Sequence, residues 1–206
     1  MAQTINFYLI RHGKTLNPSA LNGRTDVEVA PNIQEHIAAC LNEYSFENII
    51  SSPLRRCCDV AKRLQQLSMK PLVIAPEFQE LDFGKFDGVD YDRLGDDWPI
   101  LERFWQDPAN YPLPDSEPIS AGYHRVIQEW QRCVAAATQD TMIITHGGTI
   151  RFILAYLLGA DYTDSKWYSV LQIANQSVTH VQLLRYDEQN YFTVKSIGLA
   201  LPELAA

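Results

Sequence analysis

Three apolar runs in this sequence are each followed by histidine or arginine. Residues 7–10 are followed by Arg11 and His12, residues 48–51 by Arg55 and Arg56, and residues 141–145 by His146. If the runs are parallel strands, their carboxyl ends meet at one edge of a sheet, where α/β proteins place ligand crevices. We therefore expect both histidines and at least two arginines to converge on one anion-binding site.

The chemistry that suits this set of residues is phosphoryl transfer. Arginine neutralises phosphate oxygens through paired hydrogen bonds, and a neutral imidazole such as that of His12 can attack phosphorus to form a phosphohistidine. The leaving oxygen then needs a proton from a carboxylic acid, which could later activate water. Backbone N–H groups at Gly147 and Gly148, where we expect a helix to begin, could complete the phosphate cradle.

Each of these residues also has a simpler interpretation when it is taken alone. A histidine at a strand end is more often structural than nucleophilic, and arginines in the first turn of a helix are usually solvated. Gly147 and Gly148 could form a simple turn. The catalytic interpretation is favoured because the residues occur together, each at the boundary of an expected element.

The hydrophobic pattern along the chain predicts an α/β fold. Ser52 and Pro53 have the pattern of a helix N-cap and first helical residue. Strands are expected at 7–10, 48–51, 72–75 and 141–145, helices at 33–44, after 52, at 119–137 and at 150–158, and a hairpin in the last forty residues. We therefore predict one domain over residues 1–206, a three-layer sandwich whose mostly parallel sheet has helices on both faces.

Residues 82–117 differ in composition from the rest of the chain. They hold ten acidic residues against three basic ones, and seven aromatic rings. We interpret this stretch as a small cap inserted into the sheet fold, and it is called the cap segment below. Its aromatic rings could stack on a heterocyclic substrate, although packing within the cap is the commoner role of such rings.

The composition excludes some classes of partner. The net charge of −8 disfavours a nucleic-acid binder, because such proteins usually carry a basic surplus. No apolar run approaches the ~18 residues of a membrane span, and the N-terminal residues lack the pattern of a signal peptide. We therefore predict a cytoplasmic protein with a small-molecule partner, and the pattern leaves open a homodimer.

Five short motifs, in order, resemble those of the histidine phosphatase superfamily, also called phosphoglycerate-mutase-like. They are LIRHGKT at 9–15, GRTD at 23–26, SSPLRR at 51–56, ELDFG at 80–84 and THGGTIR at 145–151. The resemblance implies the phosphoglycerate-mutase-like fold, with His12 as the nucleophile and Glu80 as the acid and then the base. It implies no metal and no cofactor.

The resemblance also implies how the phosphate is held. Arg11, Arg56 and His146 would bind the transferred phosphoryl group, and Gly147 and Asn17 would add to the phosphate site. Asn17 stands one residue earlier than the asparagine of the family pattern, and Lys14 stands where the family commonly has Glu or Gln.

The cap segment guides the expectation about substrate. Its ten acidic residues against three basic ones would repel a second phosphate group, so we predict hydrolysis of a small-molecule monophosphate. The short chain and its cap most resemble the bacterial α-ribazole-5′-phosphate phosphatases of cobalamin (nucleotide loop) biosynthesis. The alternatives are a cofactor-dependent phosphoglycerate mutase, a broad-specificity phosphatase, a non-enzymatic module that binds a phospho-ligand, and a metal hydrolase that uses the histidines and Glu80 as ligands.

Overall fold

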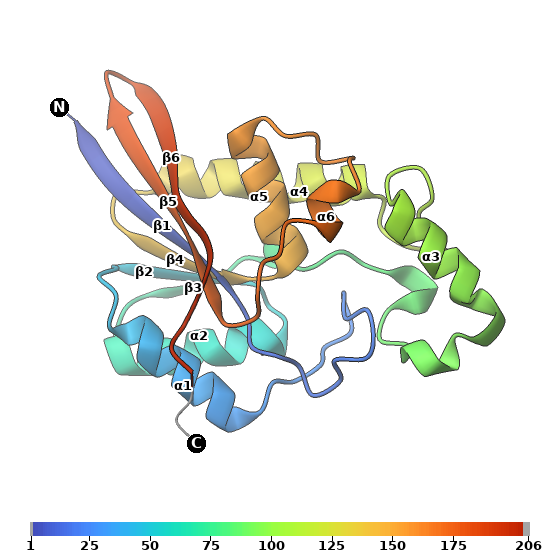
Figure 1. Cartoon of the computed structure of the whole chain (residues 1–206). Helices are drawn as coiled ribbons and strands as arrows, with labels where there is room; N and C mark the ends of the chain where they lie inside the picture. Colours follow the sequence, from blue (N-terminus) through green and yellow to red (C-terminus); the bar gives the residue numbers. More distant parts are fainter. Residues whose placement is uncertain (1, 204–206) are drawn as a thin grey trace.

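The computed structural model, which describes residues 2–203, is built around a six-stranded sheet (Figure 1). The strands are β1 (Gln3–Arg11), β2 (Asn48–Ser51), β3 (Leu72–Ile74), β4 (Thr141–Thr145), β5 (Ser177–Tyr186) and β6 (Gln189–Ala200), in the order β3-β2-β4-β1-β5-β6. The first four strands are parallel, whereas β5 pairs antiparallel with β1 and β6 pairs antiparallel with β5. The predicted mostly parallel sheet with a terminal hairpin is confirmed.

Helices cover both faces of this sheet, as predicted (Figure 1). One face carries α1 (Pro31–Asn42) and α2 (Arg55–Ser68), and the other carries α4 (Ile119–Ala136), α5 (Gly147–Leu158) and the short α6 (Lys166–Ser169). Helix α3 (Trp98–Gln106) lies apart from the sheet. Within residues 2–203, no helix has the length and apolar character that a membrane crossing requires.

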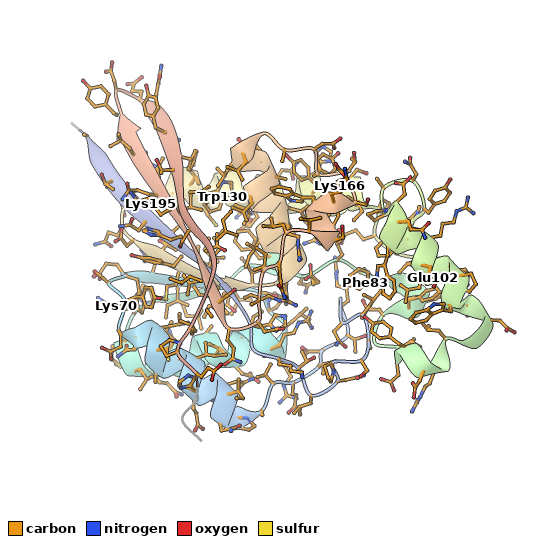
Figure 2. All side chains as sticks on the ribbon, viewed as in Figure 1. Lys70, Phe83, Glu102, Trp130, Lys166 and Lys195 are labelled. Carbon is orange, nitrogen blue, oxygen red and sulfur yellow. The ribbon has the colours of Figure 1, made fainter. Side chains whose placement is uncertain are left out.

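The two faces of β1 build the two halves of the core. Alternate residues of a strand point to opposite faces, so Ile5, Phe7 and Leu9 pack toward α4 and α5 while Ile10 packs toward α1 and α2. Trp130 of α4 is fully buried, and its ring meets Phe7 edge to face with centroids 4.9 Å apart (Figure 2). This packing holds β1 in the middle of the sheet, with its carboxyl end free to carry functional residues.

The register of the parallel strands brings the histidine motifs together. Arg11 at the end of β1 is paired with Thr145 at the end of β4, so His12 and His146 leave the sheet side by side. Their ring centroids are 5.1 Å apart. Strand β2 ends on the other side of β4, which brings α2 and Arg56 to the same edge.

The predicted start of the helix after β2 is wrong. Helix α2 begins at Arg55, its N-cap residue is Leu54, and Ser52 and Pro53 lie before it. The Ser52 hydroxyl is instead 2.8 Å from Nε2 of the His146 ring, and its contact with the Leu54 amide is long, at 3.4 Å. Tertiary contact with His146 therefore displaces the expected local cap.

The cap segment forms a small apolar cluster of its own beside the sheet. It contributes α3 and three single turns of 3₁₀ helix, at Gly84–Phe86, Tyr91–Arg93 and Gly95–Asp97. Its buried side chains are Phe86, Leu94, Leu101, Phe104 and Leu113. Phe83 lies where this cluster meets the body of the protein (Figure 2).

Candidate active site

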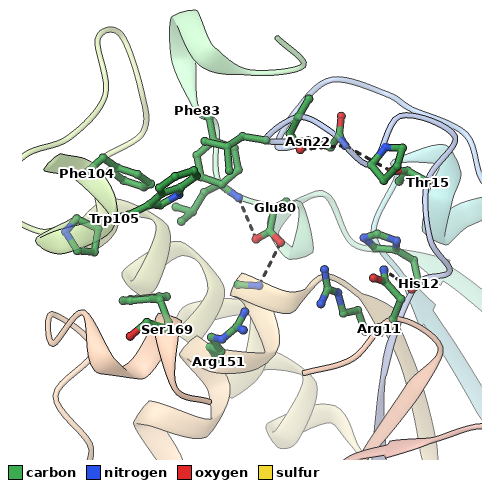
Figure 3. Close-up of a pocket in the computed structure, with 18 of the residues that line it drawn as sticks. Arg11, His12, Thr15, Asn22, Glu80, Phe83, Phe104, Trp105, Arg151 and Ser169 are labelled. Atoms are coloured by element: carbon green, nitrogen blue, oxygen red, sulfur yellow. Dashed lines mark hydrogen bonds between the residues drawn. The ribbon is translucent and has the colours of Figure 1, made fainter. Parts of the chain in front are cut away.

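A cavity of about 780 Å³ opens at the carboxyl edge of the sheet (Figure 3). Arg11 and His12 line it from the end of β1, Glu80 from the loop before the cap segment, and Arg151 from α5. The cap segment closes the far side. This is the edge at which the sequence predicted an anion site.

His12 is held in one tautomer by its neighbour. Its Nδ1 atom is 2.7 Å from the carbonyl oxygen of Gly13. Because a carbonyl only accepts hydrogen bonds, Nδ1 carries the proton and Nε2 keeps its lone pair. Burial, and next the charge of Arg56, lower the pKa of His12 well below its ordinary value of 6.5. The ring is therefore neutral at pH 7, which is the form that can attack phosphorus.

His146 has the opposite tautomer. The Nε–H of Arg56 donates to Nδ1 of His146 over 3.1 Å, so the proton of His146 is on Nε2, which donates to Ser52. Burial, and next the charge of Arg56, lower the pKa of His146 well below 6.5. Both His146 and Arg56 are completely buried and stand behind His12 rather than in the cavity wall.

The loop at residues 22–25 holds Arg56 in place. Its carbonyl oxygens at residues 25, 22 and 23 accept hydrogen bonds from the Arg56 guanidinium over 2.9, 3.0 and 2.5 Å. The amides of Gly23, Arg24 and Thr25 in turn donate to the carboxylate of Asp87, at 3.2, 2.7 and 2.9 Å. Asp87 belongs to the cap segment. Its single carboxylate therefore links the cap segment to the loop that holds Arg56 in place.

Glu80 stands at the N-terminus of α5. Its carboxylate accepts hydrogen bonds from the amides of Gly148 (3.1 Å) and Leu81 (3.2 Å). A Cβ atom on Gly148 would lie 2.3 Å from the Glu80 Oε1 atom, so only glycine permits this approach. The carboxylate is thus aimed into the cavity by the backbone of the second histidine motif.

Arg125 of α4 fixes the backbone on which Glu80 is carried. Its guanidinium donates to the carbonyl oxygens of Glu77 (2.6 Å), Gln79 (3.1 Å) and Glu80 (3.5 Å). It also makes a two-pronged pair with Glu117, with both N–O distances 2.8 Å. Arg125 is not among the site residues that the sequence predicts, because a single basic residue on a predicted helix carries no signal of its partners.

Arg11 and Arg151 flank the start of α5. No ion pair within 4.0 Å among residues 2–203 includes Arg11, Arg56 or Arg151. A Cβ atom on Gly147 would lie 3.3 Å from the Arg11 guanidinium carbon and 3.2 Å from Nη1 of Arg151. Nε of Arg11 is buried and has no hydrogen-bond partner among the described residues. Unpaired buried guanidinium groups are costly, so the cavity is built for an anion.

Aromatic side chains of the cap segment form the far wall. Phe83, Phe104 and Trp105 line the cavity together with Tyr91 (Figure 3). Trp105 is 42% exposed, and its ring meets that of Tyr91 edge to face, with centroids 5.9 Å apart. This wall is apolar and faces the arginines across the cavity.

The predicted site residues fall into three groups. His12, Arg11 and Glu80 line the cavity, Arg56 and His146 lie directly behind it, and Gly147 begins α5. Asn17 does not belong to the cavity wall. Its carbonyl oxygen accepts a hydrogen bond of 2.6 Å from Asn22, and Asn22 lines the cavity instead. A phosphate-binding role for Asn17 therefore stays a prediction.

Arg151 lines the cavity and was not among the predicted site residues. Its signal was present in the sequence, because it is a lone charge in the otherwise apolar helix of residues 147–158. Within residues 2–203, no three His, Cys, Asp or Glu side chains form a group that could hold a metal ion.

Comparison with known proteins places this chain in a family. The model of the histidine phosphatase superfamily (branch 1) matches residues 7–196. The chain belongs to this superfamily. Superfamily membership and the phosphatases among its relatives make it a phosphatase enzyme.

Curated relatives of this phosphatase are distant but nearly full length. A putative phosphoserine phosphatase 2 of Hydrogenobacter thermophilus is 25% identical over 190 residues, covering 85% of this chain and 88% of the relative. An adenosylcobalamin/alpha-ribazole phosphatase of Escherichia coli is 22% identical over 179 residues, covering 80% and 84%. A solved mycobacterial glucosyl-3-phosphoglycerate phosphatase superposes with a TM-score of 0.82 at 20% identity, covering 96% of this chain and 100% of that one. This last similarity shows a shared fold.

Proposed function

We propose that this phosphatase hydrolyses a small-molecule phosphate monoester through a phosphohistidine on His12. In the first step, Nε2 of His12 attacks phosphorus and the bond from phosphorus to the ester oxygen breaks. Glu80 gives its proton to the departing oxygen, which leaves as an alcohol. The observation that carries the proposal is the neutral His12 with a free Nε2, facing the same cavity as Arg11 and Glu80 (Figure 3).

The second step returns the enzyme to its starting state. Water gives a proton to Glu80 while its oxygen attacks phosphorus, the phosphorus–nitrogen bond breaks, and inorganic phosphate forms. Arg11 stabilises the transferred oxygens in both steps, because among residues 2–203 no carboxylate forms an ion pair with it. Arg56 and His146 complete the phosphoryl site from behind His12.

The leaving group enters the side of the cavity formed by the cap segment. A volume of about 780 Å³ lies in the usual range for small-molecule sites. Phe83, Phe104 and Trp105 offer ring faces and edges to a planar group. We therefore propose α-ribazole 5′-phosphate as the first substrate to test, with support from the name of the E. coli relative.

A panel of metabolite monophosphates that includes α-ribazole 5′-phosphate tests this proposal. We expect phosphate release without added metal, and a kcat/KM for α-ribazole 5′-phosphate above that of ribose 5-phosphate, which lacks the base. Equal kcat/KM values for these two substrates would show that the aromatic wall does not contribute to substrate selection. Efficient isomerisation of 3-phosphoglycerate, dependent on a bisphosphoglycerate, would show a mutase instead.

A further inference from the structure

Three aromatic rings of the cap segment, those of Tyr91, Trp98 and Trp105, meet in a corner. The ring centroids of Tyr91 and Trp98 are 6.3 Å apart, those of Tyr91 and Trp105 5.9 Å, and those of the two tryptophans 5.7 Å. The angles between the ring planes are 87°, 76° and 84°, so each ring stands nearly perpendicular to the other two. Three rings in this arrangement form the sides of an open cage, which is called the aromatic corner below.

The aromatic corner lies outside the buried centre of the cap segment. None of its three rings is among the five buried side chains of the cap cluster. Tyr91 and Trp98 are only partly buried, and Trp105 is exposed. Tyr91 and Trp105 also line the active-site cavity, where Trp105 lies on the opposite side from His12 (Figure 3). Packing within the cap segment therefore does not account for the position of Trp105.

The charge around the aromatic corner is negative. Residues 82–117 hold ten acidic residues and three basic ones, and each basic residue has a partner inside the segment. Lys85 and Arg93 each pair with an aspartate at 3.5 Å. The guanidinium carbon of Arg103 lies 3.8 Å from the centroid of the Tyr111 ring. Among residues 2–203, no lysine or arginine is found over a ring of the aromatic corner, so its ring faces are left for a cation from outside the chain.

A carboxylate also lies against the aromatic corner. The indole N–H of Trp98 donates to Oε1 of Glu102 over 2.8 Å, which fixes the plane of that ring. The face of an aromatic ring is electron-rich and attracts a cation that lies within ~6 Å of the ring centroid. Cages of several rings suit a quaternary ammonium group, because its methyl groups make apolar contacts while its charge is attracted to the ring faces.

We propose that the aromatic corner binds a quaternary ammonium group of the leaving alcohol, so that trimethylammonio-alkyl phosphates form a substrate class of this cavity. The two ends of such an ester match the two sides of the cavity. The phosphate dianion meets Arg11 and His12, and the cation meets the rings of the cap segment (Figure 3). The cation takes no part in the bond changes, which stay those of the proposed hydrolysis. The inference rests on that hydrolysis and names what the aromatic side of the cavity selects.

The sharpest test compares each cationic ester with its neutral carbon isostere. Phosphocholine is paired with 3,3-dimethylbutyl phosphate, and 6-(trimethylammonio)hexyl phosphate with 7,7-dimethyloctyl phosphate, so that each pair differs only in nitrogen against carbon. At the spacer length that spans the cavity, we expect kcat/KM for the cationic ester to be higher by about tenfold. Equal kcat/KM within every pair, over spacers of two to six carbons, would overturn the proposal.

Variants of the aromatic corner locate this preference. Trp105→Leu should bring the ratio of the two kcat/KM values to near one, whereas Trp105→Phe, which keeps a ring face, should keep most of it. Tyr111→Leu is the matched control, because Tyr111 is an exposed ring of the cap segment that does not line the cavity, and it should keep the wild-type ratio. A wild-type ratio in Trp105→Leu would show that the cation binds elsewhere.

Binding measured without turnover separates this inference from the proposed function. In His12→Ala, titration calorimetry should show tighter binding of the cationic ester than of its isostere, and adding Trp105→Leu should remove the difference. Selective binding without hydrolysis of any monoester by the wild-type enzyme would support the cation site and overturn the hydrolase. Hydrolysis with no preference for any cationic ester would overturn the cation site and leave the hydrolase supported.

Discussion

The rings of two buried, neutral histidines have centroids 5.1 Å apart in this site, and hydrogen bonds give the two rings different tautomers. His12 donates from Nδ1 to a carbonyl, which leaves Nε2 as a base. His146 accepts on Nδ1 from Arg56, which leaves Nε2 as a donor. Only His12 therefore has a free lone pair at the cavity. At the scale of single residues, the proposal that His12 rather than His146 is the nucleophile rests on which groups surround each ring.

Replacing His12 should remove the proposed nucleophile without unfolding the protein. We expect His12→Ala to lower kcat by more than about a thousandfold and to abolish the acid-labile phosphoenzyme seen on brief incubation with labelled substrate. The exposed His124 is a matched control, and His124→Ala should behave as wild type. Activity of the His12 variant near that of wild type would exclude it as the nucleophile.

The acid role of Glu80 predicts an effect that depends on the leaving group. Glu80→Gln should slow an alkyl phosphate by at least about tenfold more than p-nitrophenyl phosphate, whose leaving group needs little protonation. Gly148→Ala should show the same pattern, because its new Cβ would meet the Glu80 Oε1 atom at 2.3 Å. Equal losses on both esters in both variants would argue that Glu80 is not the acid.

At the scale of elements, the proposed reacting groups lie at strand ends and helix starts, and side chains outside the cavity hold them in position. Asp87 holds the loop that positions Arg56, and Arg125 holds the loop that carries Glu80. Glu117 completes the second clamp. Burial is the largest single influence and raises the pKa of Glu117, but the hydrogen bonds and charge of Arg125, together with the charge of Arg24, leave this pKa below its ordinary value. The clamp is thus an ionised, partly buried pair.

Removing the Arg125 clamp should affect both stability and the acid step. Arg125→Met leaves Glu117 without its partner, so we expect the free energy of unfolding to fall by about 2 kcal/mol in urea titrations. We also expect kcat for alkyl phosphates to fall more than kcat for p-nitrophenyl phosphate, with partial rescue in Arg125→Lys.

Arg132→Met is the control for this clamp, since Arg132 lies on the same helix and pairs with Glu129 while 77% exposed. Its effect on stability should stay below about 0.5 kcal/mol. A stability loss in Arg125→Met with no dependence on the leaving group would assign Arg125 to the fold alone.

At the scale of the whole molecule, folding buries histidines in their neutral form within a chain of net negative charge. The pKa values of His12, His146 and His180 all lie below 6.5, with burial as the main cause in each. The formal charge of the chain is −8, yet Arg11 and Arg151 line the cavity and form no ion pair with a carboxylate in the part of the chain that the structure describes. Charge is therefore distributed so that an anionic substrate meets a local positive field.

These histidines predict how stability depends on pH. The unfolded chain takes up protons near pH 6.5, whereas the folded protein takes them up only at lower pH. Stability should therefore be nearly constant above pH 7 and fall as the pH drops through 6.5, by up to about 1.4 kcal/mol per pH unit for each buried histidine. Urea titrations between pH 8 and pH 5 measure this slope, and His146→Asn should reduce it. A flat profile over this range would contradict the neutral, buried state of both rings.

Much of the fold and part of the site were predictable, because their signals are local. The ranges predicted for β2 and β4 agree with the structure, and the terminal hairpin and both helical layers are confirmed. The motif register singles out Arg56 rather than Arg55. In the structure Arg56 is completely buried, whereas Arg55 is exposed beside Asp26 and Glu28. The hydrophobic period of a segment and the order of motifs are properties of the sequence itself, so they can be recognised before the fold is known.

Contacts between segments that lie far apart in the chain were determined only by the tertiary structure. Ser52 meets His146 across 94 residues, Arg125 meets the loop of Glu80 across 45, and Asp87 meets residue 23 across 64. No local pattern encodes which of many polar side chains become partners, since the partner is chosen by how helices and loops pack on the sheet. For the same reason, the sequence could place His12 at a strand end, but only its folded neighbours decide that Nε2 is free to react.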